Sequence, residues 1–86
     1  MPLFYLHVRN TFGYARDEEG QECADLADAR RKALAGARSI LSEEVKKGNL
    51  DLHGAIEIAN ETGTILLEIP FSEAVMIAND ESPVRP

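Results

Sequence analysis

The single cysteine and the two histidines of this 86-residue sequence are the first candidates for a nucleophile, a base or a metal ligand: His7, Cys23 and His53. Cysteine-based covalent catalysis needs a thiolate adjacent to an imidazole in space, and the sequence by itself does not show such a pair. Structural zinc sites bring four ligands in two close pairs, whereas only three scattered ones are present here. Cys23 is most simply a small buried hydrophobic residue. We therefore expect no catalytic set, metal site or cofactor, and keep a small enzyme using His7 or Cys23 as an alternative.

A run of acids at Asp17, Glu18 and Glu19, followed by Glu22, is the second chemical candidate. Carboxylate oxygens bind hard cations, and calcium loops place them at alternating positions with a closing glutamate. Here three acids are adjacent, so successive side chains diverge. A solvated acidic turn closed by Gly20 is the favoured interpretation, and an enzyme that uses this turn remains an alternative.

Arg30 is a cation at a position where the helical pattern expects an apolar residue. It lies in the arc formed by Leu26, Ala33 and Ala37 at helical spacing. A guanidinium on such a stripe either extends outward or meets a carboxylate. The sequence predicts an ion pair between Arg30 and one of the four preceding acids, Asp17, Glu18, Glu19 or Glu22. An anion-binding role for Arg30 is the alternative.

The overall composition excludes several classes of protein. The chain is 44% hydrophobic and 28% charged, with a net charge of −6, which is typical of a folded domain and argues against a general nucleic-acid coat. One cysteine excludes an intramolecular disulfide and fits a reducing compartment. No apolar run approaches the ~20 residues of a membrane span, and the start lacks a signal-peptide pattern. We expect a cytoplasmic protein that does not bind membranes.

The elements that would position these residues form an α+β domain. Strands are predicted over residues 3–9, 55–59 and 64–69, with shorter extended pieces at 14–16 and 21–24. Asp25 as N-cap and Gly48 as stop delimit a long helix over 26–47. The order is β-β-α-β-β, a small antiparallel sheet with the helix packed on one face. The domain is expected over 1–77, with a flexible tail at 78–86.

Alternation along the strands assigns residues to the two faces of this sheet. The inner face, toward the helix, carries Phe4, Leu6, Val8, Ile56, Ile58, Ile65, Leu67 and Ile69. The outer face mixes polar groups with Tyr5, His7 and Leu66, which we take as a candidate interface because a half-apolar face is costly to leave in water. The leading hypothesis is a non-catalytic protein-interaction module that forms a homodimer or binds a protein partner.

Five segments of the sequence carry a resemblance to a known family. They are residues 6–9, 17–22, 25–30, 58–63 and 70–74, in this order. The chain resembles an uncharacterised family of short bacterial proteins that is classed as a domain of unknown function. The resemblance covers roughly residues 3–77 and implies no activity or site residue.

A weaker likeness, in element order alone, is to antitoxin domains of the HicB-like type. Residues 26–47 carry six Lys and Arg against three acids, so the helix is basic while the rest of the chain is acidic. Arg31 and Arg38 lie on one flank of this helix and could contact phosphate. A small regulator linked to nucleic acid is therefore a further alternative, although such a helix more often complements acids in its own domain.

Overall fold

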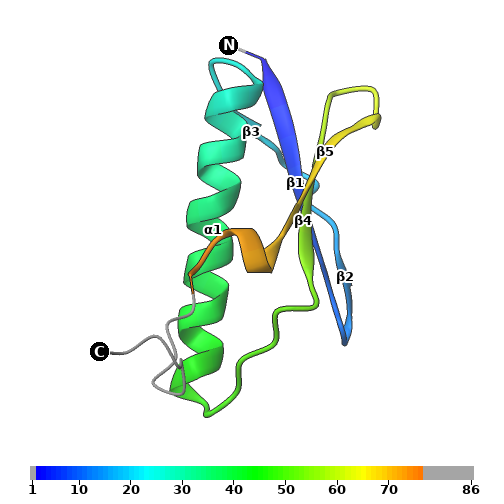
Figure 1. Cartoon of the computed structure of the whole chain (residues 1–86). Coiled ribbons are helices and arrows are strands. Elements are labelled where there is room, and N and C mark those ends of the chain that lie inside the picture. The colour runs from blue at the N-terminus through cyan, green and yellow to red at the C-terminus, as the bar shows by residue number, and fades with distance from the viewer. Residues whose placement is uncertain (1, 77–86) are drawn as a thin grey trace, which may run out of the picture.

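The long amphipathic helix and the alternating strands assemble as the sequence predicts. The structure, a computed structural model, describes residues 2–76, so the predicted tail at 78–86 lies outside the described residues. One helix packs across one face of a five-stranded antiparallel sheet, which confirms the α+β class and the β-β-α-β-β order, with the extended piece predicted at 21–24 adding a short fifth strand before the helix. Figure 1 shows the two layers, with the opposite face of the sheet uncovered by any helix. Within residues 2–76 no helix is long and apolar enough to cross a membrane.

The strands are β1 (Leu3–Asn10), β2 (Gly13–Ala15), β3 (Gln21–Glu22), β4 (Ala55–Ala59) and β5 (Ile65–Pro70). Their order across the sheet is β2-β1-β4-β5, and β3 also pairs with β1. β2 and β3 therefore follow one another along the edge of β1 that β4 leaves free. The segment between them bridges the gap in that edge.

Helix α1 (Leu26–Lys46) begins where Asp25 caps it, because the Asp25 carboxylate accepts a hydrogen bond of 2.8 Å from the Asp28 N–H. Ala29, Ala33 and Ala37 form most of its buried stripe. Their small side chains let the helix backbone approach the sheet closely. The helix thereby covers the inner face of β1 and β4.

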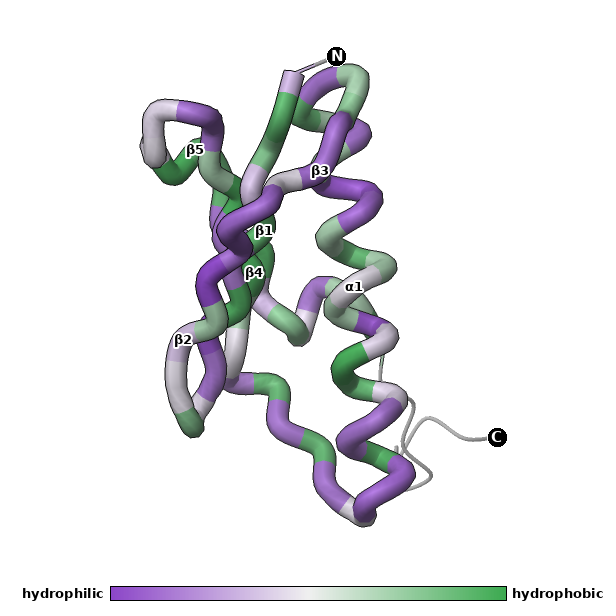
Figure 2. Tube along the Cα trace, turned by 180° about the vertical axis from the view of Figure 1, so that it is seen from behind, coloured by the Kyte–Doolittle hydropathy of each residue, from purple (hydrophilic) through white to green (hydrophobic). Residues whose placement is uncertain are grey.

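The core lies between α1 and the sheet. Figure 2 shows the helix and sheet from behind, with hydrophobic segments along β1 and β4. A 3-10 turn, η1 (Phe71–Glu73), follows β5 and returns to the helix. The buried cluster consists of Phe4, Cys23, Ala29, Ala33, Ala37, Leu41, Ile56, Ile58, Ile69, Phe71 and Ala74.

The position of Ile65 differs from the sequence-based expectation. A register shift in the β4–β5 ladder pairs Ile58 with Leu67 but Ala59 with Ile65, so that Leu66 is an extra residue. Ile65 is therefore opposite Ala59, on the outer face, and its side chain is 48% exposed. Strict alternation placed it on the inner face, and this prediction was wrong because a bulge reverses the alternation.

Candidate functional site

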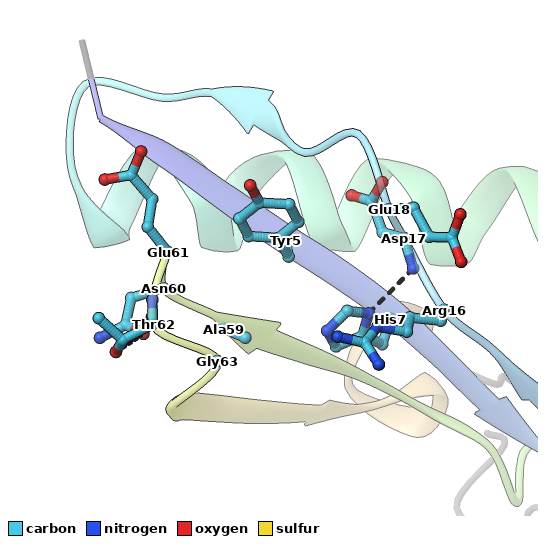
Figure 3. A pocket seen from close by; sticks show the side chains of 10 residues that line it. All are labelled: Tyr5, His7, Arg16, Asp17, Glu18, Ala59, Asn60, Glu61, Thr62 and Gly63. Carbon is cyan, nitrogen blue, oxygen red and sulfur yellow. Dashed lines mark hydrogen bonds between the residues drawn. The ribbon is translucent and has the colours of Figure 1, made fainter.

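A pocket of about 390 Å³ lies on the open face of the sheet, opposite α1. It is bounded by two loops, the segment 16–20 between β2 and β3 and the β4–β5 turn at 60–63 (Figure 3). Strand residues form its floor. The side chains that line it are Tyr5, His7, Arg16, Asp17, Glu18, Ala59, Asn60, Glu61 and Thr62, together with Gly63.

Asp17 fixes the first of these loops. Its Oδ2 accepts a hydrogen bond from the Leu6 N–H (3.1 Å), and its Oδ1 accepts from the N–H groups of Glu19 (3.2 Å) and Gly20 (3.0 Å). The carboxylate thus supplies the hydrogen-bond acceptor for β1 that a neighbouring strand would supply if β2 and β3 were continuous. Burial alone raises the pKa of Asp17, but these N–H donors outweigh it and hold the pKa below its usual value.

His7 is the most enclosed polar side chain of the pocket, with only 7% of its surface exposed. Its Nδ1 accepts a hydrogen bond of 2.9 Å from the Asp17 N–H, drawn as the dashed line in Figure 3. An accepting Nδ1 carries no proton, so the neutral ring is protonated at Nε2. The His7 ring lies between Tyr5 and Tyr14, at centroid distances of 6.5 and 5.7 Å. The protein therefore fixes both the tautomer and the orientation of this imidazole.

The Nε2 atom of His7 faces the pocket. It makes no hydrogen bond within residues 2–76, and no fully enclosed side-chain nitrogen or oxygen in this part of the chain lacks a partner. Nε2 must therefore reach the surface, and the surface that His7 lines is that of the pocket. The result is a fixed N–H donor that a ligand can reach.

Asn60 organises the second loop in a similar way. Its Oδ1 accepts hydrogen bonds from the Thr62 N–H (3.1 Å), the Thr62 hydroxyl (2.8 Å) and the Thr64 N–H (2.9 Å). Gly63 closes the turn with φ of +88°, in the left-handed region that favours glycine. Three donors on Oδ1 fix the amide, and its Nδ2 has no partner within the described residues. Asn60 is a second oriented donor on the pocket wall.

Tyr5 forms the aromatic part of the floor because Gly20 lets it lie against the first loop. Gly20 has φ of +77°, and a Cβ at this position would come within 3.0 Å of the Tyr5 ring. A side chain here would therefore strain the backbone and displace the ring. The Asp-Glu-Glu-Gly segment is thus a loop of defined conformation, in which Asp17 accepts a hydrogen bond from β1 and Gly20 leaves room for the Tyr5 ring.

Residues 3–72 match the model of a family described as a domain of unknown function, DUF6894. The chain belongs to this family. Membership of an uncharacterised family confirms that part of the resemblance seen in the sequence. No curated protein and no solved structure matches the chain.

In this DUF6894 domain the candidate nucleophile and the candidate base lie apart. Cys23 is completely buried in the core on the helix side of the sheet, while His7 lines the pocket on the open side. His53 is exposed beside Asp51, whose pKa is lowered to about 2 by the Thr11 hydroxyl and by hydrogen bonds from His53. Residues 2–76 contain no cluster of three or more potential metal ligands.

Arg30 has a different partner from the expected one. Its guanidinium lies 3.8 Å from the Glu73 carboxylate, and about half of each side chain is exposed. Among the ion pairs of residues 2–76 it has none with Asp17, Glu18, Glu19 or Glu22. The reason is that η1 brings Glu73 back to α1, while the Asp17 loop lies on the far edge of β1. Such an exposed pair contributes about 0–1 kcal/mol.

The three residues of the candidate interface differ in exposure. Tyr5 is half-buried and His7 is buried, and both belong to the pocket. Leu66 is 41% exposed on β5. Sequence reasoning found Tyr5 and His7 by alternation, but missed Arg16 and Asn60, whose proximity depends on two loops that are distant in sequence.

The basic flank of α1 is largely engaged within the domain. Arg31 forms an ion pair with Asp28, and the Arg38 Nε–H donates a hydrogen bond of 2.7 Å to the Ala74 carbonyl. Arg38 thus holds the segment after η1 against the helix. Both arginines therefore have a partner within the domain, although the Arg31 side chain is 74% exposed. Contact of this flank with nucleic acid stays a prediction.

Proposed function

We propose that this domain is a non-catalytic module that binds another polypeptide through the open face of its sheet, in a reducing cytoplasm. The single observation that supports it best is the pocket on that face, whose walls are fixed by the protein's own hydrogen bonds. A preformed concave site with a few oriented polar groups is the usual form of a binding site.

The surroundings of the pocket favour a polypeptide as the bound partner. Exposed apolar side chains lie beside it, with Ile65 48%, Leu66 41% and Tyr14 52% accessible. Polar groups alternate with them, including the Arg9–Glu68 ion pair on the same face. Apolar side chains mixed with polar groups in this way are typical of interfaces between proteins that also exist separately.

A different chain is a better occupant of this face than a second copy. The acids Glu18 and Glu61 stand at the pocket and form no ion pair within the described residues. A two-fold contact over this face would bring the acidic pockets of two copies, each chain with net charge −6, close together. A partner with a neutral or basic surface avoids this repulsion.

The test compares two matched variants of a tagged chain purified from its native host. Leu66→Glu places a charge on the open face, and Ala35→Glu places the same charge on the side of α1 opposite its buried stripe, where Ala35 is exposed. We expect the wild type and Ala35→Glu to retain the same partner and Leu66→Glu to lose it. Equal retention by both variants contradicts the proposal.

Light scattering on the purified wild type distinguishes the two occupants. A different chain as partner predicts a mass near the monomer value of 9.5 kDa for the isolated protein. A mass of about twice that value, reduced to the monomer by Leu66→Glu, assigns the face to a homodimer instead and overturns the choice of a different chain.

A further inference from the structure

We infer that the pocket binds the C-terminal carboxylate of the partner polypeptide, seated on Arg16 and the Nε2–H of His7. This inference rests on the proposed function and names the group that the open face recognises. Capture of a C-terminal carboxylate by a nest of backbone N–H groups is an established mode of peptide recognition, and in this pocket two side chains would supply the donors.

The donor character of His7 is set before any ligand arrives. The Asp17 N–H occupies Nδ1, so Nε2 carries the proton and offers a single donor toward the pocket. The ring is 93% buried, being 7% exposed, and cannot turn without breaking that hydrogen bond. A donor fixed in this way favours a ligand that places an acceptor atom, such as a carboxylate oxygen, at this point.

Arg16 supplies the charge that selects an anion. Its guanidinium lines the same pocket and forms no ion pair with any acid within residues 2–76. Figure 3 shows Arg16 and His7 on the same side of the pocket, with Asn60 and Thr62 on the other. A planar guanidinium matches the two oxygens of a carboxylate, and the His7 N–H adds a third contact.

The acids at the pocket decide which anion can enter. Asp17, Glu18 and Glu61 line it with no ion-pair partner in the described chain, so the pocket holds one positive and three negative charges. The Asp17 carboxylate is held by the three backbone N–H groups that it accepts from, which leaves Glu18 and Glu61 as the acids without any such donor. A phosphate or a nucleic-acid strand brings more than one negative charge and is repelled. A peptide terminus brings only one negative charge, and basic side chains near it would face Glu18 and Glu61.

The opposite wall suits the main chain that precedes such a terminus. The free Nδ2 of Asn60 can donate to a peptide carbonyl, and the Tyr5 ring between the walls offers a flat surface for a side chain. A volume of about 390 Å³ is at the lower end of the usual range for ligand pockets, about 300–1,000 Å³. It therefore holds the end of a chain rather than a long segment.

The test is an NMR titration of isotope-labelled full-length protein with four probes. They are N-acetyl-alanyl-alanine with a free carboxylate, the same peptide as its C-terminal amide, free alanine and inorganic phosphate. We expect only the acetylated acid to shift the His7 Nε2 and Arg16 Nε resonances strongly. Loss of the charged acceptor should weaken binding of the amide by about tenfold or more.

Matched arginine variants locate the contact. Arg16→Gln should weaken binding of the acid by about tenfold. Arg31→Gln, which removes an exposed arginine of α1 outside the pocket, should not change it, and Arg16→Lys should recover part of the affinity. The amide spectrum of each variant shows whether the fold is intact.

Equal binding of acid and amide overturns the inference, as does an acid affinity that Arg16→Gln leaves unchanged. Absence of any shift at tens of millimolar acid also overturns it. Tighter binding of phosphate or of free alanine assigns the pocket to a small molecule instead. If the acid fails while Leu66→Glu still abolishes partner retention, the open face remains the binding surface and only the carboxylate is wrong.

Discussion

Replacing Asp17 by alanine should destabilise the domain far more than replacing the acid beside it. The Asp17 carboxylate accepts hydrogen bonds from the backbone N–H groups of Leu6, Glu19 and Gly20 at 3.0–3.2 Å. Alanine leaves the Leu6 N–H without an acceptor in the gap between β2 and β3, and also releases the turn. The pocket wall then loses the group that holds it to β1.

The magnitude follows from these three contacts. Hydrogen bonds to a charged group contribute about 1.5–3 kcal/mol each when buried, and less where solvent replaces them. Asp17 is only half-buried. We therefore assign nearly the full free energy of such a bond to the Leu6 contact and only a small part of it to each of the two turn contacts. The sum is about 2–4 kcal/mol, which for a domain of this size lowers the melting temperature by roughly 10–25 °C.

Urea and thermal unfolding at neutral pH, followed by circular dichroism, measure this loss. Glu18→Ala is the matched control, because Glu18 is adjacent, exposed and accepts no hydrogen bond within residues 2–76. Its unfolding free energy should stay within about 0.5 kcal/mol of wild type. An Asp17→Ala curve that overlays the Glu18→Ala curve refutes the anchoring role of Asp17.

Three further outcomes are expected from stability measurements. Ala33→Asp should unfold the domain at room temperature, because an unpaired charge enters the fully buried helix–sheet contact at a cost of several kcal/mol. Gly36→Ala, whose Cβ meets only an atom at 3.9 Å, should raise the melting temperature, whereas Gly54→Ala, which meets backbone at 2.5 Å, should lower it. In the folded protein the carboxyl groups of Asp17 and Asp51 have pKa values below the value of about 3.9 in the unfolded chain. The two ionised carboxylates therefore stabilise the folded state fully above about pH 3.9. This stabilisation is lost as the pH falls through the folded values, so the urea midpoint should drop between about pH 4 and pH 2 and be restored on returning to pH 7.

The long helix and the main strands could be predicted because their signals are local. Ala29, Ala33 and Ala37 recur at helical spacing between an Asp25 cap and the Gly48 stop, and these patterns need no knowledge of the partner surface. Alternation in β1 likewise placed Tyr5 and His7 on the open face.

The features that escaped prediction depend on contacts between distant segments. The burial of His7 involves a hydrogen bond from the Asp17 N–H, ten residues later, and the neighbouring rings of Tyr5 and Tyr14. Ile65 changes face through a bulge that no composition signal marks. The partner of Arg30 is set by the return of η1 to the helix, and the pocket requires two loops about 40 residues apart.

Site-specific photo-crosslinking in the native host tests the central claim, that the open face of the sheet is the binding surface, most directly. A photoreactive phenylalanine analogue replaces Leu66 on the open face or, in a second strain, Ala35 on the side of α1 opposite its buried stripe. The account predicts a covalent adduct with a partner polypeptide from position 66 and none from position 35. An adduct that forms only from position 35, or none from position 66, would contradict it.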